Sequence, residues 1–436
     1  IAHDATACSL DWQVGTGLAC TGSYPIATIV STTASDGYAM LDSDAYGGAT
    51  GGTEIEDSWL TMASPVDLNG YPNVVVEFET QYRRYNSENP YIVVGIGDGS
   101  GNVVWPDLDP TTDITNMSNV FYAFPDWASQ SGVTGNATAN PEVVQVNISA
   151  ALVGLTTTQL ADIYIRFNWT GTWGYAWFVD DFKIVEQAAN DIQAQSGWIF
   201  ETNSNGAEYG RTPISHIGSS YEIGGTVLNF GVSDQTNVTL DVSFTGPTTI
   251  TASESIDSLE TDSTYTYSIM SSLDLEVGLY EGIYNFSSDD DTLGDDNILK
   301  RNFEITENVY SLDGIGVHPE EELETTSLGT NSFNGISDQF ICANEYEFKS
   351  QDTISSVTAL IAPNTLPNAE VIVYILDSTS YFNLDYGNAL FESDTYYVSE
   401  DDTTNGFINI PTVDICNSPN GVILNSGKYF IALMPS

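Results

Sequence analysis

Residues 163–185 read IYIRFNWTGTWGYAWFVDDFKIV, and this stretch decides the fold of the first part of the chain. Apolar side chains occupy every second position from Ile163 to Trp169. A turn flanked by glycines follows at Trp173, and a second, largely apolar run extends from Trp177 to Val185. A period of two is typical of half-buried antiparallel strands. The stretch therefore predicts two β-strands of an antiparallel fold.

The same alternation recurs along the chain, at residues 74–79, 238–244 and 370–376. Valine, isoleucine, threonine and tyrosine, which favour strands, are abundant, and Gly, Asn, Asp and Pro bound the runs. Helical periodicity is nearly absent, and only residues 156–161 are expected to form a turn or two of helix. Short strands with frequent turn residues predict an all-β chain of tandem antiparallel β-sandwiches.

The chain of 436 residues is too long for one ordinary domain, and three modules are expected. We place them at 1–187, 197–307 and 310–436, with the polar residues 186–196 as a linker. The chain begins at Ile1 without a methionine, as a mature protein does after removal of its signal peptide. It ends on the strand-like GKYFIALMPS without a closing turn, which leaves open whether the natural chain continues past Ser436.

The charge of the chain is strongly one-sided: nine Lys and Arg stand against sixty Asp and Glu, for a net charge of −51. Such a surface repels nucleic acid and anionic lipid, so neither is an expected partner. No apolar run approaches the roughly 18 residues of a membrane helix, so membrane insertion is not expected. Self-repulsion on this scale requires salt or bound cations, and two interpretations fit. One is general adaptation to saline surroundings, and the other is specific binding of divalent cations.

The four cysteines form two local pairs, Cys8 with Cys20 and Cys342 with Cys416. Neither pair has the Cys-x-x-Cys spacing or the neighbouring histidine of a zinc site. An even number of cysteines in local pairs predicts two disulfides and an oxidising, extracellular location.

The first module resembles the bacterial choice-of-anchor J jelly rolls, relatives of MAM and cleaved-adhesin modules. Three segments carry the resemblance: GYAMLDSDAYGG at 37–48, DSWLTMASPVDLNGYPNVVVEFETQY at 57–82, and the closing pattern at 163–185 quoted above. The resemblance implies that the first module is a jelly roll.

The second module is similar to Ig-like modules of the CARDB type. IGGTVLNFGVSDQTNVTLDVSF at 223–244 has their Gly-x-Val-x-Asn-x-Gly strand pair, and residues 278–306 have their Gly-x-Tyr strand, acidic turn and final strand. The third module is expected to be a further β-sandwich. Strings of such modules occur in surface and secreted proteins of bacteria with type IX secretion, where they serve adhesion or accompany a hydrolase.

A structural calcium ion is expected in the first module. The alternation of the last strand puts Asp180 on one face with apolar side chains, where an unpaired carboxylate is costly. Calcium prefers six to eight oxygen ligands, which loops rich in Asp supply. The resemblance to adhesin modules implies that Asp42 and Asp44 meet this strand, so the predicted ligands are Asp42, Asp44 and one or both of Asp180 and Asp181. In the alternative, Asp42 and Asp44 cap a turn and Asp180 bonds a backbone amide or Arg166.

Other acidic clusters are weaker candidates for cations. Asp289, Asp290 and Asp291 with Asp295 and Asp296 are better explained as a solvated turn. A third group, in a proline-rich loop, comprises Asp107, Asp109 and Asp113.

Sugar binding is a further hypothesis. Trp173 and Tyr175 lie in the glycine-flanked turn, and Arg83 and Arg84 are two of only nine basic residues. Exposed aromatic rings stack on sugars, and arginines donate hydrogen bonds to hydroxyl groups. The neighbouring Trp169 and Trp177 are better explained as core residues.

Catalytic motifs are absent from the sequence. The three histidines are isolated, and there is no G-x-S-x-G elbow or glycine-rich phosphate loop. We therefore do not expect an enzyme. Ser258, Thr292 and Thr353 lie in Asp-Ser/Thr triplets similar to O-glycosylation sites of type IX-secreting bacteria.

These observations predict a non-enzymatic, calcium-stabilised extracellular surface glycoprotein, either an adhesin or a subunit of a cell-surface appendage or filament. Its expected partners are other copies of itself, other surface proteins or glycans. The alternative is the carbohydrate-binding or accessory portion of a larger secreted hydrolase.

Overall fold

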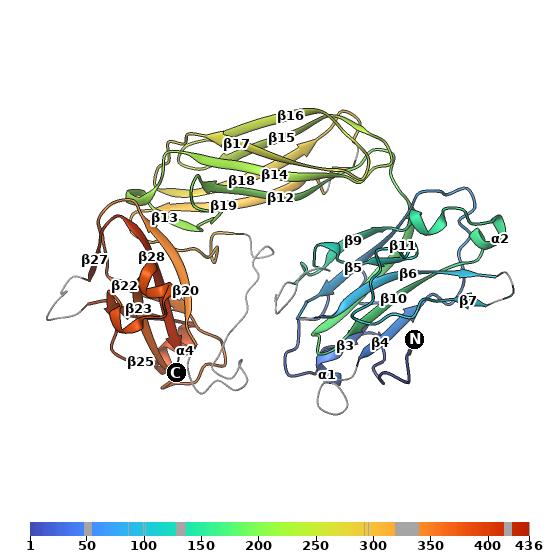
Figure 1. The fold of residues 1–436 in the computed structure, drawn as a ribbon, viewed down its shortest axis with the longest axis horizontal. Coiled ribbons are helices and arrows are strands. Elements are labelled where there is room, and N and C mark those ends of the chain that lie inside the picture. Colours follow the sequence, from blue (N-terminus) through green and yellow to red (C-terminus); the bar gives the residue numbers. More distant parts are fainter. Residues whose placement is uncertain are drawn as a thin grey trace. The chain divides into compact units, whose positions relative to one another are not determined.

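The protein is all-β, as predicted. Its computed structural model describes residues 1–47, 55–85, 87–98, 100, 102–127, 137–291, 293–294, 296–318, 340–413 and 421–435. The chain divides into two compact units, 1–189 and 190–436 (Figure 1). No helix of the described segments is long and apolar enough to cross a membrane.

The first unit contains two antiparallel sheets. In one, the order is β1-β4-β10-β6-β7, with β8 also paired to β6, and in the other it is β2-β3-β11-β5-β9. The strands of the first sheet are β1 (Ala2–His3), β4 (Glu56–Thr61), β10 (Ile163–Gly171), β6 (Asn89–Gly97), β7 (Val103–Val104) and β8 (Val120–Tyr122). Those of the second are β2 (Gln13–Gly15), β3 (Tyr38–Asp42), β11 (Ala176–Glu186), β5 (Val74–Tyr82) and β9 (Glu142–Asn147).

Strands β10 and β11 are consecutive in sequence but belong to opposite sheets (Figure 1). In β10, Trp169 pairs with Ser58 of β4 and with Pro90 of β6. The turn between β10 and β11 therefore crosses from one sheet to the other. This crossing places Trp173 at an end of the sandwich.

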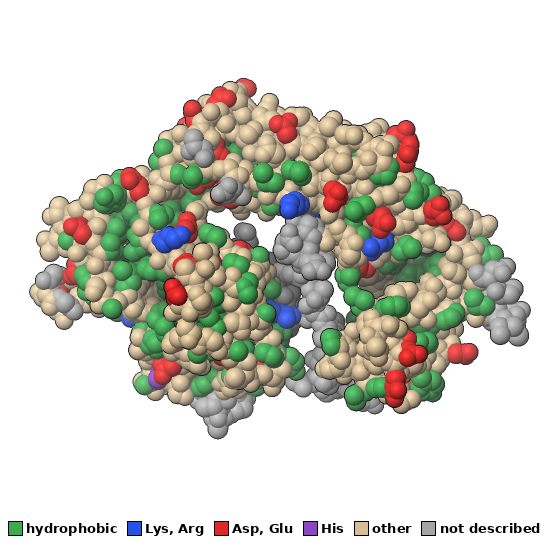
Figure 2. All heavy atoms as spheres, turned by 180° about the vertical axis from the view of Figure 1, so that it is seen from behind, with side chains coloured by type: hydrophobic (Ala, Val, Ile, Leu, Met, Phe, Trp, Pro, Cys, Tyr) green, Lys and Arg blue, Asp and Glu red, His purple; other side chains and the backbone are tan. Residues whose placement is uncertain are grey.

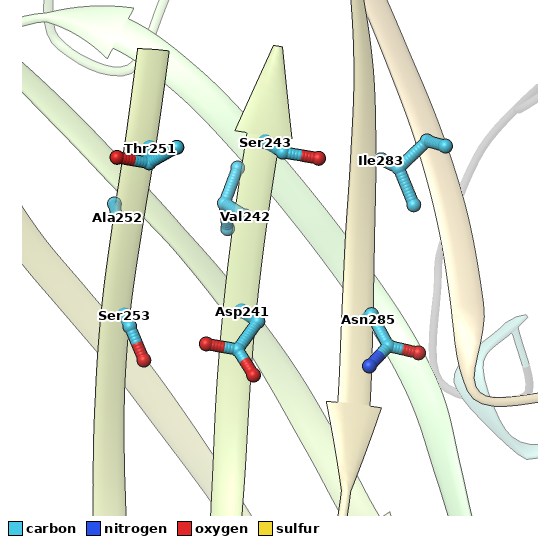
Figure 3. Close-up of a pocket in the computed structure, with 8 residues that line it drawn as sticks. All are labelled: Asp241, Val242, Ser243, Thr251, Ala252, Ser253, Ile283 and Asn285. Atoms are coloured by element: carbon cyan, nitrogen blue, oxygen red, sulfur yellow. The ribbon is translucent and has the colours of Figure 1, made fainter.

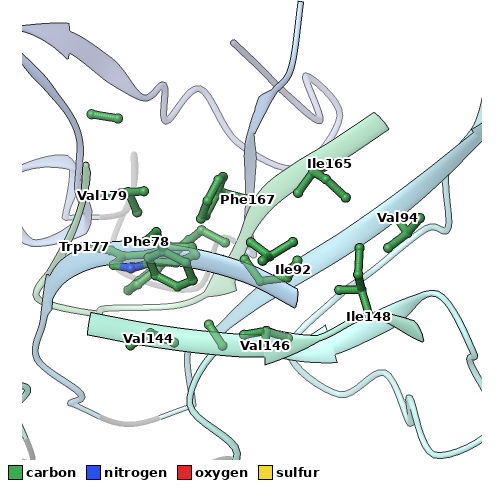
Figure 4. Packing of buried hydrophobic residues seen from close by; sticks show 14 of the residues in the cluster. Phe78, Ile92, Val94, Val144, Val146, Ile148, Ile165, Phe167, Trp177 and Val179 are labelled. Atoms are coloured by element: carbon green, nitrogen blue, oxygen red, sulfur yellow. The ribbon is translucent and has the colours of Figure 1, made fainter. Parts of the chain in front are cut away.

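The core of the first unit lies between its sheets (Figure 4). Phe78, Phe167 and Trp177 form edge-on aromatic contacts, with the Phe78 and Phe167 ring centroids 5.1 Å apart. Trp169 and Trp177 are both fully buried. These two tryptophans are core residues, as the sequence favoured, and the burial of such large rings provides much of the unit's hydrophobic stabilisation.

The second unit begins with a sandwich of two sheets. The three-stranded sheet has the order β12-β14-β17, and the five-stranded sheet has the order β13-β19-β18-β15-β16. Their strands are β12 (Ile192–Glu201), β13 (Arg211–Pro213), β14 (Tyr221–Asn229), β15 (Gln235–Thr245), β16 (Ile250–Leu259), β17 (Thr264–Ser271), β18 (Gly278–Ser287) and β19 (Ile298–Thr306). All neighbours are antiparallel except β13 and β19.

The rest of the second unit has one five-stranded sheet and two two-stranded sheets. These are β20-β28-β23-β24, with β25 also paired to β23, and the pairs β21-β27 and β22-β26. Their strands are β20 (Cys342–Phe348), β21 (Asp352–Ile354), β22 (Ser356–Leu360), β23 (Glu370–Asp377), β24 (Phe391–Glu392), β25 (Tyr396–Tyr397), β26 (Phe407–Pro411), β27 (Val422–Leu424) and β28 (Gly427–Pro435).

Helices in the described part of the chain are few and short. The α-helices are α1 (Ser43–Tyr46), α2 (Thr157–Leu160), α3 (Ser378–Phe382) and α4 (Glu400–Asn405), and the 3-10 turns are Pro125–Trp127, Ser149–Leu152, Ile214–His216 and Tyr386–Asn388. Helix α2 lies where the sequence predicted a helical turn, and Thr156 begins it as a capping box with Gln159.

Two parts of the second unit have separate hydrophobic cores, which meet at a cluster of tyrosines. The ring of Tyr310 lies 4.9 Å from that of Tyr209 and 5.0 Å from that of Tyr346. The Tyr209 hydroxyl donates to the Glu345 carbonyl at 3.0 Å. The tyrosine contacts connect the two parts, which belong to one compact unit. The predicted boundary between modules at 307–310 stays a prediction.

The expected disulfide between Cys8 and Cys20 is absent, and both thiols are free. Cys8 packs in the core between the sheets, and its Sγ donates to the Asp57 carbonyl at 3.4 Å. Cys20 packs against a different cluster, around Tyr38 and Phe178. Closeness in sequence therefore does not bring the two side chains together. Cys342 is also free, and Cys416 lies outside the described residues.

Acidic side chains are distributed over the face seen in Figure 2, among few basic ones. Most basic residues pair with an acid. Examples are Lys183 with Glu77 at 3.0 Å and Arg211 with Glu304 at 2.8 Å. Surface pairs of this kind contribute little individually, so they offset only part of the repulsion.

Candidate binding site at the turn between β10 and β11

Trp173 is the exposed centre of this turn. Its side chain is 44% exposed, and its backbone has φ 62°. A left-handed backbone conformation is a true outlier for a bulky residue such as tryptophan. Such strain persists only where the surroundings impose it, and it clusters at functional sites.

Tyr175, two residues after Trp173, contacts two side chains of the segment that follows β5. The Arg83 guanidinium carbon lies 4.6 Å from the centroid of the Tyr175 ring, and Tyr85 contacts the same ring edge-on at 5.4 Å. We call Trp173, Tyr175, Arg83 and Tyr85 the Trp173 site. The structure brings together Arg83 and Tyr175, two of the residues named for sugar binding, whereas Arg84 is only 3% exposed and is not part of the surface.

The close packing of the turn explains the glycine beside Trp173. A Cβ on Gly174 would lie 2.4 Å from the buried Trp169 ring, so only glycine fits. The Asp44 backbone N–H donates to the Tyr175 carbonyl at 3.0 Å, which ties the turn to α1.

A buried carboxylate lies beneath the turn. Glu56 is 0% exposed and accepts hydrogen bonds from Ser43 Oγ at 2.8 Å and from Trp169 Nε1 at 2.8 Å. Burial, with a smaller contribution from the nearby Glu88, raises the pKa of Glu56 to about 7 although the hydrogen bonds lower it. Glu88 is itself 1% exposed and accepts from the Tyr85 backbone N–H.

The predicted calcium ligands serve two separate loops. Asp42 caps α1, with Oδ1 accepting from the Ala45 N–H at 3.0 Å and Oδ2 from the Thr21 N–H at 2.7 Å. Asp44 accepts from the Tyr24 N–H. Both carboxylates therefore accept hydrogen bonds from backbone amides of residues 21–24.

Asp180 and Asp181 hold a different segment. Asp180 accepts from Ser31 Oγ at 2.6 Å, and Asp181 accepts from Thr33 Oγ1 at 2.8 Å. Asp181 has φ 47° at an irregularity of β11 before Lys183. Among the described residues no three His, Cys, Asp or Glu side chains gather as a metal site, so the calcium ion stays a prediction.

In the described structure Arg166 does not bond Asp180, the partner that the alternative interpretation gave it. Its guanidinium carbon lies 4.5 Å from the Trp59 ring centroid and 3.7 Å from that of Trp105. Burial lowers the pKa of Arg166 to about 10, and burial raises the pKa of the nearby Asp57 to about 6. The sequence placed Arg166 on the polar face of β10, but it contained no signal that two distant tryptophans enclose it.

A groove of about 340 Å³ lies on the five-stranded sheet of the second unit (Figure 3). Asp241, Ser243, Thr251, Ser253 and Asn285 line it from β15, β16 and β18. None of these residues carries a distinctive signal in the sequence, because they occupy ordinary outward positions of strands.

The structure describes two of the three candidate glycosylation positions. Ser258 on β16 and Thr353 on β21 are exposed, as an acceptor must be. Thr292 lies outside the described residues.

No protein-family model and no curated protein matches the chain. Among solved structures, a GH2 beta-galacturonidase from Eisenbergiella tayi is similar at 13% identity and TM-score 0.28, over 69% of this chain and 42% of that one. A family 30 carbohydrate-binding module of a Clostridium thermocellum cellulase is similar at 13% identity and TM-score 0.22, over 41% of this chain and 94% of that one. Bacteroides uniformis beta-glucuronidase 2 matches at 14% identity and TM-score 0.26, over 69% of this chain and 32% of that one. The chain thus spans less than half the length of either enzyme.

Proposed function

We propose that the chain is a non-enzymatic extracellular surface protein that binds glycans through the Trp173 site. It would act as an adhesin, or as the carbohydrate-binding portion of a larger secreted hydrolase. The observation that carries the proposal is the exposed Trp173 ring, held on a strained turn.

The chemistry of the site supports a glycan. Indole and phenol rings supply flat apolar surfaces for a sugar ring, while their edges and Arg83 offer polar contacts. An ordered aromatic residue also loses little conformational entropy when it binds. The charge of −51 disfavours nucleic acids as the stacked partner.

The test is a glycan-array screen of the whole chain in calcium-containing saline, followed by titration of the best glycan. We expect Trp173→Ala to weaken binding by at least about tenfold, or about 1.4 kcal/mol, as for a central aromatic contact. Tyr71→Ala is the matched control, because Tyr71 is a similarly exposed aromatic residue of the same unit. An array without binding, or equal affinity of Trp173→Ala and parent, would refute the proposal.

A second candidate is an assembly subunit of a surface filament, with other copies of the chain as partners. Strand β16 is the edge of its sheet, is ten residues long, and contains neither proline nor lysine, which usually protect such edges. Electron microscopy in calcium-containing saline, before and after EDTA, tests this candidate. Filaments that fall apart in EDTA would support an assembly with calcium at its joints, and dispersed particles in both samples would exclude it.

A further inference from the structure

One buried carboxylate holds the Trp173 turn from beneath. Glu56 accepts from the Trp173 backbone N–H, from Trp169 Nε1 and from Ser43 Oγ. The Gly174 N–H donates to Ser43 Oγ at 2.9 Å, so a second N–H of the turn reaches the carboxylate through this hydroxyl. Two successive amides of the turn therefore depend on one side chain.

The conformation of the turn depends on these hydrogen bonds. Trp173 has φ 62°, a conformation that a bulky residue adopts only when its surroundings impose it. Glu56 belongs to β4 and Ser43 begins α1, so the groups that impose it lie on elements outside the turn. Both are fully buried, which keeps water from replacing the turn's hydrogen bonds.

We propose that Glu56 is the positioning residue of the Trp173 site: its ionised carboxylate holds the left-handed turn and so presents the Trp173 ring to a ligand. The reference to a ligand rests on the proposed glycan-binding function. The hold on the turn does not, so the two can be tested separately.

Ionisation of Glu56 decides how firmly the turn is held. A carboxylate only accepts hydrogen bonds, whereas a protonated carboxyl carries an O–H that must itself donate. Protonation therefore leaves the carboxyl with fewer acceptor positions, so one of the groups that donate to it loses its hydrogen bond. This loss loosens the turn. The titratable groups facing Glu56 are Glu88, from the segment after β5, and Cys8, from the N-terminal segment. Because burial raises the pKa of Glu56 to about 7, the change falls near neutral pH.

The experiment is ¹⁹F NMR of the whole chain labelled with 5-fluorotryptophan, titrated from acidic to mildly alkaline pH. The chain has eight tryptophans, and Trp173→Phe assigns the Trp173 resonance by its disappearance. We expect this resonance to shift with a midpoint near pH 7 in the parent and to lose its titration in Glu56→Gln, which cannot ionise. Asp57→Asn is the matched control, because Asp57 is also buried on β4 but bonds Asn168 and not the turn.

The outcomes separate the possibilities. An unchanged titration in Glu56→Gln, or its loss in Asp57→Asn as well, would overturn the proposal. If Glu56→Gln does not fold, Ser43→Ala takes its place, since it removes the hydroxyl that connects the Gly174 N–H to the Glu56 carboxylate. Broadening of the Trp173 resonance in Ser43→Ala would then support the proposal, and an unchanged resonance would contradict it. A negative glycan array beside a positive titration would refute the glycan but leave the role of Glu56 intact.

Discussion

At the scale of single residues, Glu56 combines a local benefit with a cost to the whole unit. Its ionised form is the better acceptor for the turn, but a buried charge is expensive to desolvate. Burial, with a smaller contribution from Glu88, raises the pKa of Glu56 to about 7 although three hydrogen bonds lower it. Local order at the Trp173 site is therefore maintained at the expense of stability, as is common at functional sites.

This balance predicts how stability depends on pH. Because the folded pKa of Glu56 is raised to about 7 from an ordinary 4.5, the folded state binds this proton more tightly. Binding of this proton stabilises the folded state fully below the pKa of the unfolded chain, and this stabilisation is lost as pH rises through the pKa of the folded state. The free energy of unfolding should fall between pH 5 and 8 by about 2.5 kcal/mol more in the parent than in Glu56→Gln.

Urea unfolding followed by tryptophan fluorescence measures this difference, because Trp198 is the only tryptophan beyond residue 189. Glu77→Gln is the control, since the half-buried Glu77 pairs with Lys183 and hydrogen bonds lower its pKa. An identical pH slope in the parent and in Glu56→Gln would contradict the prediction.

At the scale of elements, the strands were predicted correctly, but the turns between them decide which sheet each strand joins. The alternation in 163–185 correctly predicted β10 and β11. It did not show that the strands belong to opposite sheets, because alternation reports only that each strand has a buried face. The same limit applies to Arg166, whose outward position was predicted but whose contacts with Trp59 and Trp105 were not.

The tyrosine cluster of the second unit leads to a prediction at this scale. Tyr310 contacts Tyr209 and Tyr346, and its hydroxyl donates to the Glu347 carbonyl at 3.2 Å. Tyr310→Ala should remove about 3 kcal/mol of packing. Because two cores meet at this cluster, calorimetric unfolding of the unit should then separate into two transitions.

Tyr397→Ala is the control for that experiment, because Tyr397 is exposed in the same unit. It should leave the thermogram unchanged. A single, unsplit transition in Tyr310→Ala would mean that other contacts couple the two parts.

At the scale of the whole molecule, the net charge of −51 is the dominant property. Salt screens repulsion between exposed charges, so melting temperature should rise steeply with ionic strength. The predicted calcium ion would add a specific effect to this screening, so calcium chloride should raise the melting temperature more than sodium chloride does at equal ionic strength. Differential scanning fluorimetry checks this, and an additional calcium effect that disappears in Asp42→Asn would establish the predicted ion.

Local patterns in the sequence determined the strands, the all-β class and the charge, because each depends on neighbouring residues or on composition alone. Only the tertiary structure decided that Cys8 and Cys20 lie in different clusters and that the four predicted calcium ligands serve two loops. The sequence also gave no sign that Glu56 supports Trp173, since more than a hundred positions separate them. The physical reason is the same in each case: hydrogen bonds and packing act between atoms adjacent in space, and the pairing of sheets makes distant residues adjacent.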